Sequence, residues 1–284
     1  MQSIVRPHEL RDLVAQWRRA GERVAFVPTM GNLHPGHADL VHRAGALADR
    51  VIVSIFVNPL QFGPNEDFAA YPRTPDEDRK LLEQLDVDLL FTPEVHDMYP
   101  RDQGATAIVQ VPDLDGILCG AFRPGHFTGV ATIVTKLLNL VQPDMALFGE
   151  KDFQQLMIIR RAAVDLCMPV EIVGVPTMRE SDGLAMSSRN RYLTPPQRVL
   201  APRIFAELET IRRALEGGSR EFVALEQAGF AALQQAGFKP DYFSIRDADT
   251  LGVAETSKGD LVVLTAARIG RARLIDNVRA KTRK

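Results

Sequence analysis

Residues 24–37 of the chain read Val24-Ala25-Phe26-Val27-Pro28-Thr29-Met30-Gly31-Asn32-Leu33-His34-Pro35-Gly36-His37. The opening apolar run is typical of a β-strand covered on both faces, and the residues after it repeat their apolar positions with helical spacing. The stretch therefore predicts a strand, a tight turn with two histidines, and a helix. Because open α/β sheets bind ligands at the carboxyl ends of their strands, we expect a ligand at this turn. Gly31 and Gly36 allow the backbone to approach it closely, and the helix start offers N–H groups to an anion.

Strand-like and helix-like segments alternate as far as residue 175. The predicted strands cover residues 24–27, 51–57, 89–91, 107–111, 145–148 and 170–175, and the predicted helices cover residues 36–48, 75–86, 128–141 and 153–167. Thr74 followed by Pro75 is a helix-start signal, with Thr74 as the capping residue. This alternation predicts βαβ units in a Rossmann-like, doubly wound and mostly parallel sheet.

The pattern changes after Pro176. A polar loop leads into two helical regions that end near Gly217 and Gly237, and three short strands are predicted at residues 242–246, 261–267 and 273–277. We therefore expect two domains: residues 1–176 with the parallel sheet, and residues 177–284 as a smaller α+β domain.

Composition excludes several function classes. The 284 residues are 45% hydrophobic and 25% charged, with a formal net charge of −2, which argues against a general nucleic-acid binder. Two cysteines are too few for a disulfide framework, and we expect both to be reduced, with Cys167 on the core face of its helix. No apolar run reaches about 18 residues and the N-terminus lacks a signal-peptide layout, so we expect a cytoplasmic enzyme with no membrane or nucleic-acid partner.

The two histidines of the turn have three interpretations. They are ordinary polar residues at a helix start, ligands of a metal together with His42, or donors to a phosphate. A metal site is disfavoured because no carboxylate or cysteine nearby completes it. An imidazole beside a helix N-terminus suits a phosphate oxygen, and the string Met-Gly-x-Leu-His-x-Gly-His resembles the signature of nucleotidyl-transferring enzymes, which cut ATP between its α- and β-phosphates.

Four further polar strings are candidates, and each has a plain structural alternative. Asn58 and Gln61 follow the second strand and suit hydroxyl or carboxylate substrates, or else they cap that strand end. Lys151 suits phosphates at a ligand edge, whereas Asp152 beside it is also a good helix cap. The loop Met186-Ser187-Ser188-Arg189-Asn190 closes over a triphosphate or forms a polar hinge, and Arg123-Pro124-Gly125-His126-Phe127 binds a ligand or is a solvated loop.

Strings 29–37, 58–61, 149–152 and 186–189 each follow a predicted strand. Parallel strands of a doubly wound sheet end at one edge, so these strings are expected to converge on one ligand. No P-loop pattern occurs in the chain, so string 149–152 is not a P-loop.

With these strings the chain resembles the pantothenate synthetase family over essentially its whole length. The resemblance is carried by residues 28–37, by Phe56-Val57-Asn58-Pro59-x-Gln61-Phe62, by Phe148-Gly149-Glu150-Lys151-Asp152-x-Gln154-Gln155 and by residues 186–190. No motif position departs from the family pattern; Asn32 and Pro35 fall where it is permissive.

The resemblance implies a two-step ligation in which pantoate and ATP give pantoyl adenylate, and β-alanine then displaces AMP. It also implies Mg²⁺ with no protein ligands identified, a homodimer, and a C-terminal lid domain. By position, His37, His34, Lys151 and Arg189 are the catalytic candidates, with His37 of acid type, and Gln61, Gln155 and Asn58 are the substrate-binding ones. The expected ATP-binding residues are Met30, Gly31, Asn32, Leu33, His34, Pro35, Gly36, His37, Gly149, Glu150, Lys151, Asp152, Met178, Met186, Ser187, Ser188 and Arg189.

Three rival functions are weighed against this one. A nucleotidyltransferase with a phosphate-bearing acceptor would favour Arg or Lys where Gln61 and Gln155 stand. A non-catalytic nucleotide-binding module does not need both histidines together with Lys151 and Arg189. A metal-dependent hydrolase would carry stoichiometric zinc.

Overall fold

The computed structural model describes residues 1–64, 66, 68–101, 103–254 and 259–281. The chain forms two compact units, Met1–Glu150 with Ile158–Pro176, and Lys151–Met157 with Thr177–Lys284. Segment 151–157, which is expected in the first domain from the sequence, groups instead with the second unit; it contains the end of η3 (Glu150–Asp152) and the start of helix α8 (Phe153–Asp165).

The first unit is built on a six-stranded parallel sheet with the strand order β1-β4-β3-β2-β5-β6. The strands are β1 (Gln2–Ile4), β2 (Val24–Thr29), β3 (Arg50–Ile55), β4 (Leu89–Phe91), β5 (Met145–Gly149) and β6 (Glu171–Val175). Val24–Val27 are completely buried, as expected for a strand with both faces covered. The predicted doubly wound parallel sheet is confirmed.

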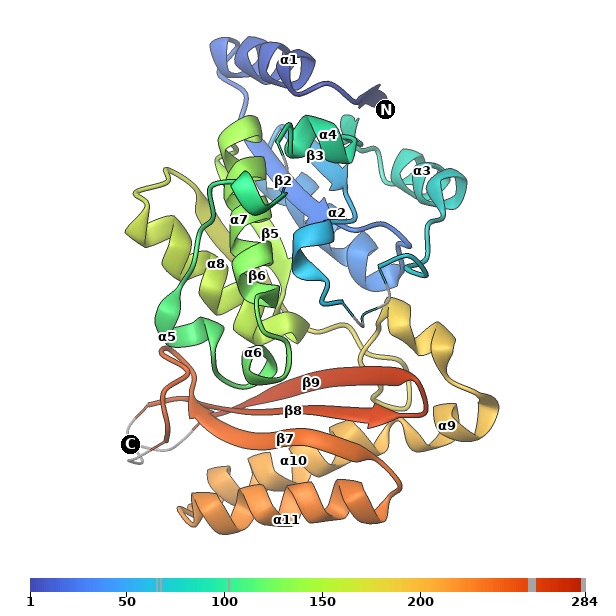
Figure 1. Ribbon diagram of the computed structural model, residues 1–284, viewed down its shortest axis with the longest axis vertical. Coiled ribbons are helices and arrows are strands. Elements are labelled where there is room, and N and C mark those ends of the chain that lie inside the picture. The colour runs from blue at the N-terminus through green and yellow to red at the C-terminus, as the bar shows by residue number, and fades with distance from the viewer. Residues whose placement is uncertain (65, 67, 102, 255–258, 282–284) are drawn as a thin grey trace. The chain divides into compact units, whose positions relative to one another are not determined.

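Helices cover both faces of this sheet (Figure 1). The helical segments of residues 1–165 are α1 (Pro7–Arg19), α2 (Pro35–Leu47), η1 (Pro59–Gln61), α3 (Pro75–Gln84), α4 (Val95–Met98), η2 (Gln103–Ala105), α5 (Pro112–Asp115), α6 (Cys119–Phe122), α7 (His126–Val141), η3 (Glu150–Asp152) and α8. Helix α2 packs on the face that carries Ala25 and Val27, whereas Phe26 points to the other face because strand side chains alternate. Helices α1 and α7 contact one another and β2.

The strand order reverses between β2 and β5. From β2 the chain builds β3 and β4 on one side, and it then returns to place β5 and β6 on the other. A crevice at such a reversal is the usual ligand position in doubly wound sheets. Residues 30–37 leave β2 at this edge and Gly149 ends β5 there, which positions the histidine turn for ligand binding.

Several sequence expectations are wrong. Residues 107–111 form no strand, since the Val109 N–H donates to the Thr132 hydroxyl of α7 and Ile108 is exposed. Strand β1 and helix α1 were not expected. Helix α3 begins at Pro75 as predicted, but the Thr74 side chain does not cap it. Cys167 is exposed rather than in the core, because α8 ends before it.

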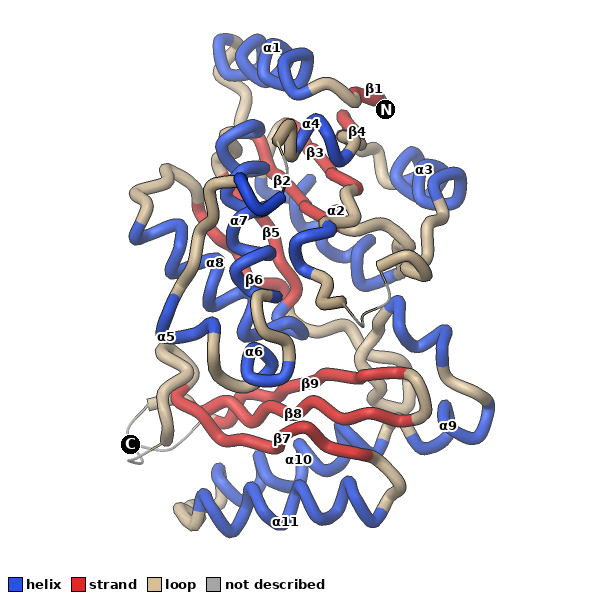
Figure 2. The backbone as a smooth tube through the Cα atoms, in the orientation of Figure 1, coloured by secondary structure: helices blue, strands red, loops and turns tan. Residues whose placement is uncertain are grey.

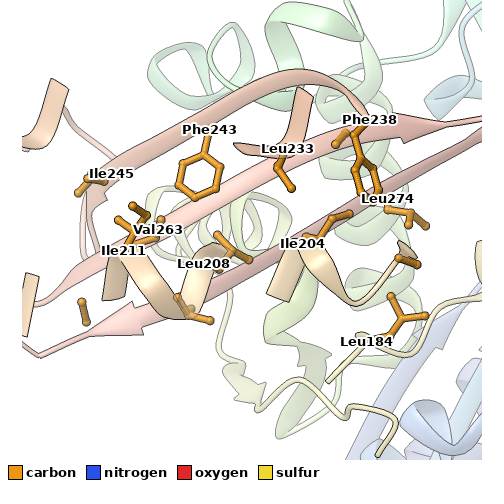
Figure 3. Packing of buried hydrophobic residues seen from close by; sticks show 14 of the residues in the cluster. Leu184, Ile204, Leu208, Ile211, Leu233, Phe238, Phe243, Ile245, Val263 and Leu274 are labelled. Carbon is orange, nitrogen blue, oxygen red and sulfur yellow. The ribbon is translucent and has the colours of Figure 1, made fainter. Parts of the chain in front are cut away.

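The second unit combines helices with a three-stranded antiparallel sheet of order β7-β8-β9 (Figure 2). Its elements are η4 (Ser188–Tyr192), α9 (Pro195–Leu200), α10 (Arg203–Glu216), α11 (Phe222–Gln235), β7 (Lys239–Asp247), β8 (Leu261–Ile269) and β9 (Ala272–Ala280). Figure 3 shows Leu208 and Ile211 of α10 and Leu233 of α11 facing side chains of the sheet. This is the smaller α+β fold that the sequence predicts. None of the helices in the described ranges has the length and apolar character needed to cross a bilayer.

Candidate active site

The turn after β2 is held in shape by a buried carboxylate on α3. Gly31 and Asn32 adopt left-handed backbone conformations, with φ of 78° and 51°. Asp78 accepts hydrogen bonds from the N–H groups of Asn32 (2.8 Å) and Leu33 (2.7 Å), and a Cβ atom at Gly31 would lie 3.0 Å from Asp78 Oδ2. Gly31 therefore gives room to Asp78 as well as allowing the turn.

The Asp78 contacts lead to a stability prediction. Asp78→Asn replaces one acceptor oxygen by an NH₂ group, which leaves one buried N–H without its acceptor. Hydrogen bonds to charged groups contribute about 1.5–3 kcal/mol, so we expect the free energy of unfolding to fall by about 2 kcal/mol. Denaturant titration measures it, and Asp76→Asn, an exposed position in the same helical turn, is the matched control. Equal stability of both variants would contradict this assignment.

The two histidines cap helix α2. His34 Nδ1 accepts from the Gly36 N–H (3.2 Å), and His37 Nδ1 accepts from the His34 N–H (3.3 Å), with the ring centroids 4.1 Å apart. A neutral imidazole whose Nδ1 accepts carries its hydrogen on Nε2. The helix start thus fixes both rings as Nε2–H tautomers, and the capping interpretation and the phosphate-donor interpretation are compatible.

The amides of Asn58 and Gln61 lie in one buried network. Asn58 Nδ2 donates to Gln61 Oε1 (3.1 Å) and to the Gly129 carbonyl (3.1 Å), and Gln61 Nε2 donates to Met30 Sδ (2.9 Å). Gln61 therefore presents its NH₂ group next to the histidine turn, as the convergence of strings 29–37 and 58–61 predicts. The hydroxyl of Tyr99 donates to Asn58 Oδ1 (2.7 Å), a contact that the sequence analysis missed.

His126 fixes the backbone of Gln61. Arg123 donates to His126 Nε2 (2.8 Å) and, with two bonds of 2.6 Å, to Glu66. Because a guanidinium only donates, the hydrogen of His126 is on Nδ1, which lies 2.7 Å from the Gln61 carbonyl. Burial acts to raise the pKa of the Glu66 carboxyl, but Arg123 holds it below its usual value. The side chains of Arg123 and His126 are therefore engaged in hydrogen bonds within the protein, beside Gln61, and the solvated-loop alternative does not describe them.

In the second unit, Lys151 lies beside the loop that carries residues 186–190. The two line one pocket, whose polar residues are Lys151, Ser187, Asn190 and Asp276. The side chain of Lys151 is only 16% exposed, and its Nζ lies 3.6 Å from Asp152 Oδ2. Strings 151–152 and 186–190 therefore converge within this unit.

A buried ion pair anchors that loop to β9. Arg179 donates to both carboxylate oxygens of Asp276 (2.6 and 2.9 Å) and to the Gly183 carbonyl (3.1 Å). Burial raises the pKa of the Asp276 carboxyl, and Arg179 acts in the opposite direction. Asn277 Nδ2 donates to the Lys151 carbonyl (3.0 Å), so β9 holds both the lysine and the loop.

The remaining predicted site residues lie at the ends of secondary-structure elements or in the adjoining loops. Met186 donates its N–H to the Met178 carbonyl (3.0 Å), and the Ser187 hydroxyl accepts from the Arg189 N–H (3.3 Å) at the start of η4, which includes Ser188. Pro35 and Gly36 open α2, Gly149 ends β5, Glu150 starts η3, and Gln155 lies on α8 in segment 151–157.

The sequence profile described as Pantoate-beta-alanine ligase matches residues 2–279. The chain belongs to the pantoate–β-alanine ligase family. Members of this family form pantothenate from pantoate, β-alanine and ATP, and the chain is such a ligase.

Curated relatives of this ligase are similar to it over nearly their whole sequences. The pantothenate synthetase of Methylococcus capsulatus is 54% identical over 270 residues, which are 95% of this chain and 94% of that protein. A pantothenate synthetase of Pseudomonas putida is 54% identical over 278 residues, 98% of this chain and 97% of that one.

Solved structures show the same fold as this ligase. A pantothenate synthetase from Thermus thermophilus has a TM-score of 0.91 at 47% identity and covers 98% of this chain and 99% of its own. The pantoate–β-alanine ligase from Francisella tularensis, solved with β,γ-ATP and β-alanine, has a TM-score of 0.80 at 34% identity and covers 98% and 97%.

Proposed function

We propose that the polar strings described above carry out the chemistry of this ligase. In the first step a pantoate carboxylate oxygen attacks the α-phosphorus of ATP, pyrophosphate leaves, and pantoyl adenylate forms. In the second step the β-alanine amine attacks the acyl carbon, AMP leaves with the bonding electron pair, and the amine loses a proton. A carboxylate is ionised at neutral pH, so the first step needs positioning and charge stabilisation rather than a general base.

One observation supports the proposal most directly: the Nδ1 atoms of His34 and His37 accept from the start of α2, which assigns their hydrogens to Nε2. Neutral Nε2–H groups beside a helix N-terminus act as fixed donors to phosphate oxygens that gain charge as pyrophosphate leaves. His37 then acts as a hydrogen-bond donor, a refinement of the acid-type assignment drawn from the family resemblance.

Other residues are assigned to ATP in the same way. Lys151 is a mostly buried cation in a pocket with Ser187, and Arg189 follows on η4. These groups suit the negative charge of a triphosphate. We propose that they bind ATP with Met30, Gly31, Asn32, Leu33, Pro35, Gly36, Gly149, Glu150, Asp152, Met178, Met186 and Ser188.

Pantoate is assigned to neutral amides. Gln61 is 8% exposed and presents its NH₂ group, and Asn58 orients it. An amide donor suits the hydroxyl and carboxyl oxygens of pantoate, and we assign Gln155 to the same substrate and Gln61 also to β-alanine.

Mg²⁺ is expected to arrive with ATP. Across residues 1–64, 66, 68–101, 103–254 and 259–281, no three His, Cys, Asp or Glu side chains are grouped to hold a metal. The described residues therefore fit a cation bound mainly through the phosphates of ATP; the carboxylate of Asp152, which is 46% exposed and 3.6 Å from Lys151 Nζ, would lie beside it. When bound, Mg²⁺ neutralises charge on the leaving pyrophosphate.

A homodimer in the cytoplasm and a lid function for residues 177–284 complete the proposal, on the strength of the family resemblance. Sedimentation equilibrium of the purified protein measures the first of these.

Isotope exchange tests the adenylate mechanism. With pantoate and Mg²⁺ but no β-alanine, labelled pyrophosphate is expected to exchange into ATP, because the first step is reversible and independent of the amine. Gln155→Ala should require about tenfold more pantoate for the same exchange, as loss of a substrate hydrogen bond contributes about 1.4 kcal/mol.

The controls use other acceptors. An enzyme with a phosphorylated acceptor would show exchange only with that acceptor, and a binding module would show none. Folded protein that binds ATP but shows no pantoate-dependent exchange would overturn the mechanism.

A further inference from the structure

The amide groups of Asn58 and Gln61 have only one orientation that fits their surroundings. The backbone N–H of Leu60 donates to Asn58 Oδ1 (3.3 Å), and the carbonyl of Gly129 accepts from Asn58 Nδ2 (3.1 Å). An N–H group cannot accept and a carbonyl cannot donate, so these two partners distinguish the oxygen of Asn58 from its nitrogen.

The orientation of Asn58 determines that of Gln61. The second hydrogen on Asn58 Nδ2 points to Gln61 Oε1 at 3.1 Å, which uses the amide oxygen of Gln61. The NH₂ group of Gln61 is then directed toward Met30, whose sulfur lies 2.9 Å from Nε2. A flipped Gln61 would place its NH₂ group against that of Asn58, so the buried pair excludes the flip.

Tyr99 supplies the shortest contact in this network. Its hydroxyl lies 2.7 Å from Asn58 Oδ1, whereas the Leu60 N–H lies 3.3 Å from the same oxygen. Tyr99 follows α4, is 5% exposed and packs against Phe56 at 6.3 Å between ring centroids, with Lys136 Nζ 4.5 Å from its own ring centroid. Burial raises the pKa of the Tyr99 hydroxyl, which keeps it protonated and able to donate.

We propose that Tyr99 is a positioning residue which, through Asn58, makes Gln61 a hydrogen-bond donor toward the acid substrate. The inference rests on the proposed contact between Gln61 and pantoate. A chain of donors running from Tyr99 to Asn58 to Gln61 ends in an NH₂ group, and such a group selects a substrate that offers an oxygen acceptor. Tyr99 itself touches no reacting atom.

The test compares Michaelis constants in Tyr99→Phe, which removes only the hydroxyl. Without the short bond, Asn58 Oδ1 keeps only the longer bond from the Leu60 N–H (3.3 Å), so Asn58 and Gln61 are held less firmly and we expect the KM of pantoate in the pyrophosphate exchange to rise about 5- to 10-fold. The KM of ATP should change less than about twofold. Tyr242→Phe in the second unit, which removes a hydroxyl far along the chain, is the matched control.

A double-mutant cycle separates positioning from a general structural effect. In a Gln61→Ala background, Tyr99→Phe should raise the KM of pantoate by less than about twofold, because the group it positions is gone. Additive effects in the double variant, or equal rises in the KM of pantoate and of ATP, would overturn the inference.

Two further outcomes distinguish this inference from the proposal it rests on. If Gln61→Ala leaves the KM of pantoate unchanged, the assignment of Gln61 to pantoate fails whatever Tyr99 does. If Gln61→Ala raises it and Tyr99→Phe does not, only the inference about Tyr99 fails.

If the Tyr99→Phe variant does not fold, Asn58→Asp tests the same series of hydrogen bonds. It keeps both acceptor contacts but cannot donate to Gln61, so the KM of pantoate should rise here too; an unchanged value would overturn the inference.

Discussion

His37→Ala is expected to lower the rate of adenylate formation by about 10²- to 10³-fold, the usual cost of losing one preorganised donor to a developing charge. His37 is expected to contribute less to ATP binding, because its Nε2–H group gains most when charge accumulates on the leaving pyrophosphate. Single-turnover formation of pantoyl adenylate gives the rate, and calorimetry gives the affinity for ATP.

Two controls separate this chemistry from helix capping. His37→Glu keeps an acceptor for the His34 N–H at the same capping position but has no N–H to donate, so it should recover the stability lost in His37→Ala without recovering the rate. His42→Ala removes an exposed histidine of the same helix and should change neither quantity. A His37→Ala rate within a few-fold of the parent would remove His37 from the mechanism.

Asp276→Ala should be the most destabilising of the proposed substitutions. Arg179 has its carboxylate partner at 2.6 Å with only 4% of the Asp276 side chain exposed. Removing one member of such a pair leaves the other charge buried, and the free energy of unfolding is expected to fall by about 3–5 kcal/mol. Urea unfolding measured by circular dichroism provides the value.

An exposed ion pair in the same unit is the matched control. Arg203→Ala breaks the contact with Glu207, in which the arginine is 55% exposed, and should cost less than about 1 kcal/mol. The KM of ATP should also rise in Asp276→Ala, since the loop with Ser187 loses its anchor. An unfolding midpoint equal to that of Arg203→Ala would show that the pair contributes nothing.

Long periodic segments made most of the fold predictable. Val51–Val53 and Val24–Val27 are continuous apolar runs, and both are buried in central strands. The incorrect predictions concern segments whose secondary structure depends on contacts with residues far away in the sequence. Residues 107–111 are an apolar run of the kind found in strands, but the Val109 N–H donates to the Thr132 hydroxyl of α7 instead of to a neighbouring strand. Strand β1 has three residues and exists because it pairs with β4, which no local pattern reveals.

The candidate site was predictable to the extent that its residues follow strands. This rule selects the histidine turn, Asn58, Gln61 and Lys151 as candidate residues. It does not select Asp78, Tyr99 and Asp276, because each acts on a residue far along the chain: 46 positions for Asp78 and Asn32, 41 for Tyr99 and Asn58, and 97 for Arg179 and Asp276. The role of a buried carboxylate or hydroxyl can be recognised only once its hydrogen-bond partner, which lies far away in the sequence, is known.

The close approach of α7 to η1 limits how this enzyme can be redesigned for bulkier acids. A Cβ atom at Gly129 would lie 2.4 Å from the Leu60 carbonyl oxygen and 2.7 Å from the Gln61 nitrogen. The backbone of α7 at Gly129 therefore packs directly against the backbone of Leu60 and Gln61. The contact involves main-chain atoms only, so any residue larger than glycine at position 129 would displace the backbone of Leu60 and Gln61. Given the proposed contact of Gln61 with pantoate, room for a longer or more branched acid has to come from other parts of the site, because the backbone under Gln61 cannot move closer to α7.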